Sequence, residues 1–257
     1  MKRVATLLLT LFATSAVAQD EADWDLIVDP EENLTAAFVA YEGGLGVLAR
    51  CKDEAFHLMV TGLAPEDGFT RQMQVRFGDE ESVERSWFVG ENPATAFSYT
   101  PAMAARNLRD GGTLDIVVRE AGPNGENLRY VFEVPESASA VNQTLEACGK
   151  PVEDPRDVFL ADLPEDGLPV DLEWARQPRG YYPAGRTYTR GVAVVSCLTQ
   201  PDGRLRECMV ETEWPSGGGF GEAALRATRN GRLRNVDPAV TEVPTVIVSW
   251  TTTFRME

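Results

Sequence analysis

Short apolar runs that alternate with polar positions fill residues 24–134, and glycine-containing turns separate them. An alternation with period two is typical of strands that have one face buried. Turn signals such as Asp67-Gly68 and Asn124-Gly125 lie between the runs. Many short strands at regular spacing predict a mainly antiparallel, sandwich-like β domain over residues 19–150. The strands are expected at 24–29, 34–41, 45–51, 56–62, 73–78, 85–90, 114–120 and 128–134.

Two helices are expected in the same domain, at 101–109 and 137–148. Pro101 suits the first turn of the first helix. In the second, Ala138, Val141, Leu145 and Cys148 fall on one helical stripe, which places Cys148 on the buried face. Cys51 ends a predicted strand, so we expect a Cys51–Cys148 disulfide.

The stretch VVSCLTQPDGRLRECMV, residues 194–210, indicates a β-hairpin. Strands at 192–199 and 205–211 would be joined by a four-residue loop, 201–204. In that register Val195 faces Val210 and Cys197 faces Cys208, whereas a slip by one residue sends the two sulfurs to opposite faces. The hairpin therefore predicts a Cys197–Cys208 disulfide, the alternative being two free buried thiols.

A helix and a last strand follow the hairpin. Phe220, Ala223, Ala224 and Ala227 lie at helical spacing, and the strand expected at 243–255 places Val246, Val248, Trp250 and Phe254 on one face. The order hairpin, helix, strand predicts a small antiparallel sheet packed by one helix over residues 179–257. The fold class expected for the whole chain is therefore α+β.

Between the two predicted domains, residues 151–178 contain five prolines and eight acidic residues. Prolines at this density exclude a continuous helix or a central strand. We interpret the segment as an acidic linker in which Val158-Phe159-Leu160 docks onto a domain.

The N-terminus has the pattern of an export signal. Lys2 and Arg3 precede an apolar run of about fifteen residues, shorter than the roughly 20 residues of a membrane span, and Ala16-Val17-Ala18 fits a cleavage site. We expect residues 1–18 to be removed and the mature protein to be periplasmic, starting near Gln19. The alternative is an uncleaved anchor that holds the protein on the inner membrane. Four cysteines in an exported chain favour two disulfides.

Charge and residue types exclude several functions. The net charge is −16; residues 19–150 hold 24 acids and 10 bases, and residues 179–257 hold 8 acids and 10 bases. Such a chain repels phosphate, so we expect no nucleic-acid partner. His57 is the only histidine, which disfavours a Ser-His-Asp triad and a multi-histidine metal site. Acidic neighbours such as Glu211/Glu213 and Asp79–Glu81 are expected to be solvated. We therefore expect no catalytic residue, no metal and no cofactor.

Residues 179–257 resemble the C-terminal domain of the TonB energy transducers, and most of all a disulfide-containing subgroup. The residues that carry the resemblance are Tyr182-Pro183, Gly191, the Cys197…Asp202-Gly203…Cys208 hairpin, Glu213-x-Pro215, Gly219-Phe220-Gly221, Ala223-Ala224-Leu225 and the strand TVIVSWTTTF. The front half is more weakly similar to invasion-associated and type VI secretion-associated periplasmic β-proteins, through Trp24, Asp29-Pro30, Arg50-Cys51 and Cys148.

The resemblance implies that a peptide of an outer-membrane or envelope protein pairs with an exposed last strand. The residues it assigns to this role are Tyr182, Pro183, Thr245, Val246, Ile247, Val248, Ser249, Trp250 and Thr251. A true transducer also has an uncleaved membrane helix and a long proline-rich spacer, and both are missing from the pattern read here. We therefore expect a binding module. An anchored energy transducer is the first alternative, and a periplasmic enzyme with clustered polar residues in a front-domain pocket is the second.

Overall fold

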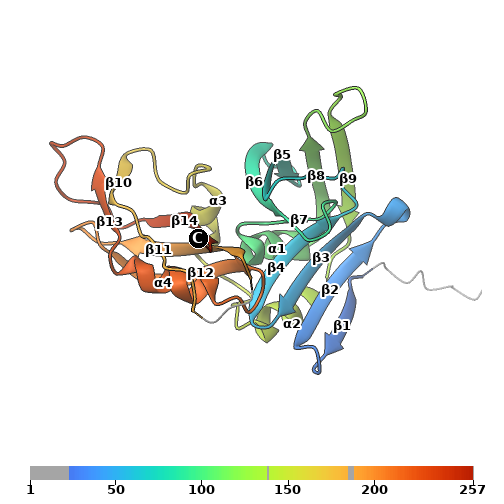
Figure 1. Cartoon of the computed structure of the whole chain (residues 1–257). Helices are drawn as coiled ribbons and strands as arrows, with labels where there is room; N and C mark the ends of the chain where they lie inside the picture. Colours follow the sequence, from blue (N-terminus) through green and yellow to red (C-terminus); the bar gives the residue numbers. More distant parts are fainter. Residues whose placement is uncertain (1–22, 138, 185–187, 257) are drawn as a thin grey trace, which may run out of the picture.

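The computed structural model describes residues 23–137, 139–184 and 188–256, and it is mainly antiparallel β with a few short helices (Figure 1). The fold is therefore richer in β structure than the α+β class expected. The front part contains β1 (Asp25–Asp29), β2 (Leu34–Ala40), the 3-10 turn η1 (Glu42–Gly44), β3 (Gly46–Lys52), β4 (Ala55–Thr61), β5 (Thr70–Phe77), β6 (Val83–Val89), β7 (Ala96–Phe97), α1 (Pro101–Arg109), β8 (Gly112–Val118), β9 (Leu128–Val134) and α2 (Ala140–Ala147).

All nine front strands belong to one antiparallel sheet, the front sheet, with the order β1-β2-β3-β4-β7-β6-β5-β8-β9. The expected antiparallel β structure is confirmed, but the strands form one continuous sheet instead of the two separate sheets of a sandwich. The two-residue strand β7 pairs with β4 on one side and with β6 on the other, so it joins the two halves. Buried residues of both halves, among them Leu58 and Ile116, form one core with Leu108 of α1 and Leu145 of α2.

Both predicted front helices are present, and α1 spans the expected residues. Residue Ala138 of the predicted stripe lies outside the described residues, whereas Val141 and Leu145 are fully buried. The Cys51–Cys148 disulfide is present, with the two Cα atoms 5.4 Å apart. It ties the end of α2 to β3, as the two apolar patterns predicted.

The back part contains α3 (Asp157–Ala161), β10 (Leu172–Arg176), β11 (Arg190–Thr199), β12 (Leu205–Trp214), α4 (Phe220–Thr228), β13 (Arg232–Asn235) and β14 (Ile247–Arg255). Three strands in the order β12-β11-β14 form the back sheet, and β10 pairs with β13 separately. Ala193, Val195, Val248, Trp250 and Phe254 point to one face of the back sheet, where they pack with Phe220 and Ala224 of α4. The segment 151–178 is thus structured: it supplies α3 and β10. Of its apolar triplet only Leu160 is buried, while Val158 and Phe159 are exposed.

The β11–β12 hairpin reaches the predicted disulfide by a different route. Gln200 N–H donates to Arg204 O at 2.8 Å and Gly203 has φ 79°, so the turn is one residue shorter than expected. The tip register is Thr199↔Leu205; an irregularity at Glu207, where φ is 49°, then shifts the register to Ser196↔Met209. A β-bulge inserts one residue into one strand, and here it restores the register that the longer loop would have given. The Cys197–Cys208 disulfide forms, with Cα atoms 4.1 Å apart.

The second face of the back sheet packs against the front sheet. Val192 and Val194 of β11 contact a cluster that contains Met59 of β4, Phe88 of β6 and Phe97 of β7. Strand β4 is buried on both faces because Phe56, Leu58 and Val60 point into the front core while His57 and Met59 point to the back sheet. The back sheet is therefore covered by α4 on one face, and on the other by the front sheet at Val192 and Val194 and by the segment that carries α3, whose Arg156 Nη1 donates to Ser196 Oγ at 3.1 Å (Figure 1).

Among the described residues, no helix has the length and apolar character needed to cross a membrane. The predicted signal, residues 1–18, and its cleavage point lie outside the described residues. Two disulfides indicate an oxidising, extracytoplasmic location.

Candidate functional site

The two edges of the back sheet differ in how they are covered. Strand β12 lies against the front part: Thr212 Oγ1 donates to Phe56 O at 3.0 Å, and Lys150 Nζ donates to Val210 O at 2.6 Å. Strand β14 forms the other edge of the sheet. An edge strand presents unpaired backbone groups to which another strand can add. The β14 edge is therefore the candidate site.

The outward side of β14 can be assigned residue by residue. Ser249 N–H donates to Gly167 O at 2.8 Å, so its backbone groups point away from β11. Because strand backbone groups alternate in direction, those of Thr251, Thr253 and Arg255 point outward too. Within the described residues, these three N–H groups have no backbone hydrogen bond. The outward edge is thus occupied at Ser249 and open from Thr251 to Arg255.

Residues 163–168, here called the strap, accept the one backbone hydrogen bond that the described residues show on the outward side of β14, from Ser249 N–H to Gly167 O. Gly167 N–H donates to Pro164 O at 2.9 Å, which closes a tight turn. Gly167 has φ +72°, and a Cβ at this position would lie 2.1 Å from Ser249 O. Only glycine can bring the strap this close to β14.

The front sheet holds the strap in place. Glu165 accepts hydrogen bonds from Ser86 Oγ and, at 3.1 Å, from Gln72 Nε2. Arg85 Nη2 donates to Ala161 O at 2.9 Å, just before the strap. The strap is therefore a bridge between β5 and β6 of the front sheet and β14 of the back sheet.

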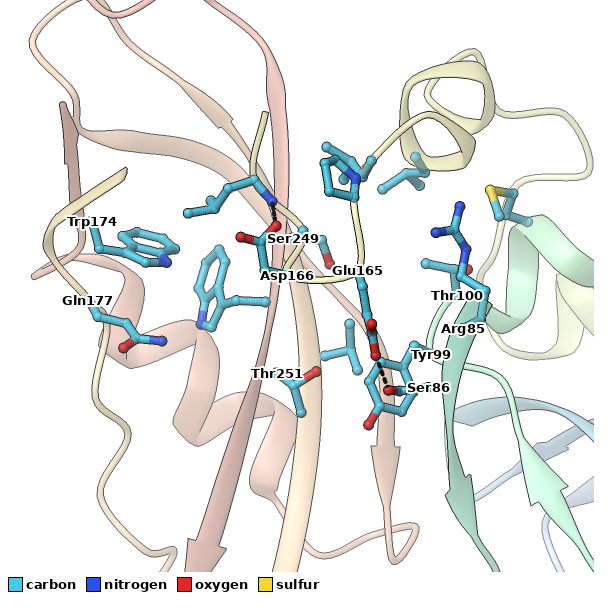
Figure 2. A pocket seen from close by; sticks show the side chains of 18 residues that line it. Arg85, Ser86, Tyr99, Thr100, Glu165, Asp166, Trp174, Gln177, Ser249 and Thr251 are labelled. Atoms are coloured by element: carbon cyan, nitrogen blue, oxygen red, sulfur yellow. Dashed lines mark hydrogen bonds between the residues drawn. The ribbon is translucent and has the colours of Figure 1, made fainter. Parts of the chain in front are cut away.

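A cavity of about 340 Å³ opens beside the strap and along β14. Ser249, Trp250 and Thr251 of β14 line its middle. Figure 2 shows Trp174 and Gln177 to one side of β14, and Tyr99, Thr100, Arg85, Ser86 and Glu165 to the other. The open edge therefore begins, at Thr251, in a groove with one wall from the back part and one wall from the front part and the strap, whereas Thr253 and Arg255 lie outside its lining.

The groove is polar as well as aromatic. Burial, with help from the charge of Glu165, raises the pKa of Tyr99, so the phenol is neutral over the physiological pH range. Burial lowers the pKa of Arg85, against the raising effect of Glu165. Trp174 and Trp250 meet edge to face, with ring centroids 5.3 Å apart. The indole Nε1–H of Trp250 is buried and has no hydrogen-bond partner within the described residues.

The residues assigned from the TonB resemblance divide between this groove and the core. Ser249, Trp250 and Thr251 line the groove, whereas Ile247 and Val248 are buried beside it. Tyr182 packs against Phe220, with ring centroids 5.7 Å apart, and Pro183 is buried, so neither lines the groove.

The start of the last strand also differs from the prediction. Thr245 and Val246 precede the strand, which begins at Ile247, because Val246 N–H is held by Thr199 Oγ1 at 2.9 Å instead. The expectation that the whole edge is exposed is wrong at Ser249, where the strap covers it.

Two acidic residues expected in solvent are structural instead. Glu211 is 2 % exposed and is bonded to Ser196 Oγ and Arg156. The Glu213 carboxylate accepts from Gly219 N–H at 3.3 Å and Gly221 N–H at 2.6 Å, at the start of α4. The prediction that Glu211 and Glu213 are solvated is wrong because both faces of β12 are packed, with Arg156 beside Glu211 and the start of α4 beside Glu213. Asp79, Glu80 and Glu81 are exposed, as expected.

His57 is buried and hydrogen-bonded at the junction of the two sheets. Its Nε2–H donates to Glu213 O at 2.8 Å, and Arg50 Nη2 lies 3.4 Å from Nδ1, which fits the neutral tautomer with its proton on Nε2. Burial, and then the charge of Arg50, lower the pKa of His57 to about 4. This histidine is a contact between β4 and β12, remote from the groove.

The sequence did not point to the front-part wall or to the strap glycine. Tyr99 and Met103 follow the two-residue strand β7, which has no periodic signal, and Trp174 lies in the segment interpreted as a linker. The available signal was the Pro164-Glu165-Asp166-Gly167 turn, whose glycine suits a positive φ. Among the described residues, no cluster of three or more His, Cys, Asp or Glu side chains could hold a metal ion.

Comparisons of this chain with protein-family models, with curated proteins and with solved structures find no match.

Proposed function

We propose that this protein is a periplasmic, non-enzymatic binding module that takes an extended peptide of an envelope or outer-membrane transport protein as an added strand on β14. The observation that carries the proposal is the run of outward backbone groups at Thr251, Thr253 and Arg255, which is open within the described residues and begins at Thr251 in the lining of the groove. Strand addition gives affinity through main-chain hydrogen bonds, and alternate side chains give selectivity. The TonB resemblance of residues 179–257 supports the same role for this strand.

A groove that already has its two walls suits this mode of binding. The edge strand is held by β11 along its whole length, from Arg190↔Arg255 to Leu198↔Ile247. A fixed edge loses little conformational freedom when a partner strand joins it, so more of the interaction energy appears as affinity.

The experiment uses peptides selected on the full-length protein from a random library of short linear peptides. Thr253→Pro removes one outward N–H without touching the ladder to β11, and proline is tolerated in edge strands. The matched control is Thr253→Val, which keeps the N–H and removes only the hydroxyl.

We expect the selected peptides to bind the wild type and the Thr253→Val variant alike, and to bind Thr253→Pro about tenfold or more weakly. Amide exchange of the wild type serves as a second readout, since a bound strand should slow exchange at Thr251 and Thr253. Peptides that bind Thr253→Pro normally and leave both amides unprotected would refute the proposal.

A further inference from the structure

The two walls of the β14 groove differ in chemistry. Trp174, Gln177 and Trp250 form one wall, on the side of the sheet that α4 covers. Tyr99 of the front part lies on the other wall, beside Glu165 of the strap (Figure 2), and Met103 of α1 also lines the cavity. A peptide in the groove would therefore show each of its two faces to a different set of side chains.

Alternation along β14 fixes which peptide residue meets which wall. Trp250 points to the α4 side, and Ser249 and Thr251 point to the front-part side. Residues directly opposite each other in paired strands point to the same face, with Cβ atoms about 4.5–5.5 Å apart. The peptide residue opposite Trp250 would then face Trp250 and Gln177, and its neighbour opposite Thr251 would face Tyr99 and Met103.

The wall at Trp250 contains a hydrogen-bond donor, the indole N–H, that has no acceptor within the described residues. Trp250 is 5 % exposed, lines the cavity, and its Nε1–H has no hydrogen-bond partner within the described residues. A buried polar group without a partner is costly, and such a group in a native structure calls for an explanation. A ligand that brings an acceptor to this N–H would remove the cost.

Charge selects the kind of acceptor. The chain carries a net charge of −16, and the carboxylates of Glu165 and Asp166 line the same cavity. The cation in the lining, Arg85, already donates to Ala161 O. A carboxylate in the ligand would meet this negative field, whereas the carbonyl oxygen of an amide would not. Asn and Gln side chains supply that oxygen without charge.

The opposite wall favours an apolar side chain. Tyr99 stacks on Phe88 with ring centroids 4.1 Å apart, and Phe88 belongs to the apolar cluster between the two sheets. Met103 and Leu163 line the cavity next to it. A thioether side chain adapts its shape to the group packed against it.

We propose, on the basis of strand addition to β14, that the peptide places an Asn or Gln side chain on the Trp250 indole N–H and an adjacent apolar side chain against Tyr99 and Met103. The front part of the chain thus takes part in choosing the partner. Binding specificity belongs to both sheets, not to the TonB-like part alone.

The test is a double-mutant cycle on the full-length protein. Its probes are two synthetic peptides that differ at one position, an Asn-containing peptide from the selected library and its Asn→Leu counterpart of similar shape. Trp250→Phe removes the indole N–H that lacks an acceptor. The matched control is Trp174→Phe, which removes an indole from the same wall; within the described residues, the Trp174 N–H is not among the buried polar groups that lack a hydrogen-bond partner. A parallel Met103→Ala variant tests the front wall.

We expect the wild type and Trp174→Phe to prefer the Asn peptide about fivefold to tenfold, and Trp250→Phe to lose that preference. Met103→Ala should weaken the binding of peptides that have a bulky apolar residue next to the Asn or Gln. It should leave the binding of peptides with alanine at that position unchanged. If Trp250→Phe has lowered the stability of the fold, amide exchange of the wild type with the two peptides still gives the answer, since the Asn peptide should slow the Trp250 indole N–H and the Leu peptide should not.

The outcomes separate this inference from the proposed function. Peptides that protect the Thr251 and Thr253 amides, but that show no Asn or Gln preference sensitive to Trp250→Phe, overturn the side-chain assignment and leave strand addition standing. Failure of every selected peptide to protect those amides overturns both.

Discussion

The front sheet and the back sheet bury their strands in different ways. The front sheet has nine strands, with β1 and β9 at its two edges, and together with α1 and α2 it encloses one core built from residues of the front part. The back sheet has three strands, and its second face is covered by the front sheet together with the segment that carries α3. A small sheet that depends on its neighbours can be held rigidly while one of its edges stays open, and this arrangement places Ser249, Trp250 and Thr251 of β14 along the groove.

The two disulfides give the largest expected contrast between the regions. The front bridge joins residues 97 apart in sequence, and the hairpin bridge joins residues 11 apart. On the chain-entropy model, removing Cys51–Cys148 costs about 4–5 kcal/mol and removing Cys197–Cys208 about 3 kcal/mol. Urea unfolding of the paired Cys→Ser variants measures both free energies. An equal or larger loss from the hairpin pair would contradict this ranking.

The ion pairs at the junction should matter next. Arg156 contacts Asp154 at 2.6 Å and Glu211 at 3.3 Å, and these carboxylates are 4 % and 3 % exposed. Arg156→Met removes the ion-pair partner of Glu211 and, within the described residues, leaves Asp154 with Arg106 alone, 3.7 Å away, which should lower the free energy of unfolding by about 3 kcal/mol. The control is Arg234→Met, whose pair with Glu173 is exposed and should cost under about 1 kcal/mol. Similar urea midpoints for the two variants would show that the junction is solvated.

The junction should also respond to pH through His57. Folding lowers the pKa of this group from 6.5 to about 4, so its contribution to stability is complete above pH 6.5 and is lost as the pH falls toward 4. Over that range the advantage of the wild type over His57→Gln should shrink by up to about 3 kcal/mol. The chain has a single histidine, so an NMR titration of the imidazole signals measures this pKa directly. A titration midpoint near pH 6.5 would mean that the two sheets separate in solution.

The smallest effect concerns the strap. Gly167 and Gly149 both have positive φ, but only a Cβ at Gly167 meets Ser249, since nothing lies within 4 Å at Gly149. Alanine at either position should lower the free energy of unfolding by about 1–2 kcal/mol, because a residue with a Cβ is strained at positive φ. Gly167→Ala should in addition release the strap and speed amide exchange at Ser249. Unchanged exchange there would show that the strap does not hold that edge position.

Much of the fold followed from local patterns. All eight expected front strands, α1 and both cysteine pairs are present, because alternation and helical stripes report which face of each element is buried. The four-residue loop was wrong because the bulge at Glu207 leaves no signal in the alternation. The run AFHLMV of β4 did contain a hint of burial on both faces, since a continuous apolar run is typical of a strand covered on each side.

The site was less predictable than the fold. The resemblance singled out β14, but the strap that limits its edge and the wall formed by Tyr99 and Met103 come from segments far apart in sequence. The acidic, proline-rich composition of 151–178 indicated a linker that docks through one apolar triplet, whereas pairing of β10 with β13 and the contact of Gly167 with Ser249 are tertiary. Local composition does not report such contacts.

Amide exchange along β14 in the free protein tests the central claim most directly, because it reads each outward and inward N–H separately. The account predicts slow exchange at Trp250 and Thr252, which face β11, slow exchange at Ser249 under the strap, and fast exchange at Thr251 and Thr253. Protection of Thr251 and Thr253 equal to that of Thr252 would mean that the edge is already covered, and it would contradict the assignment of β14 as the binding edge.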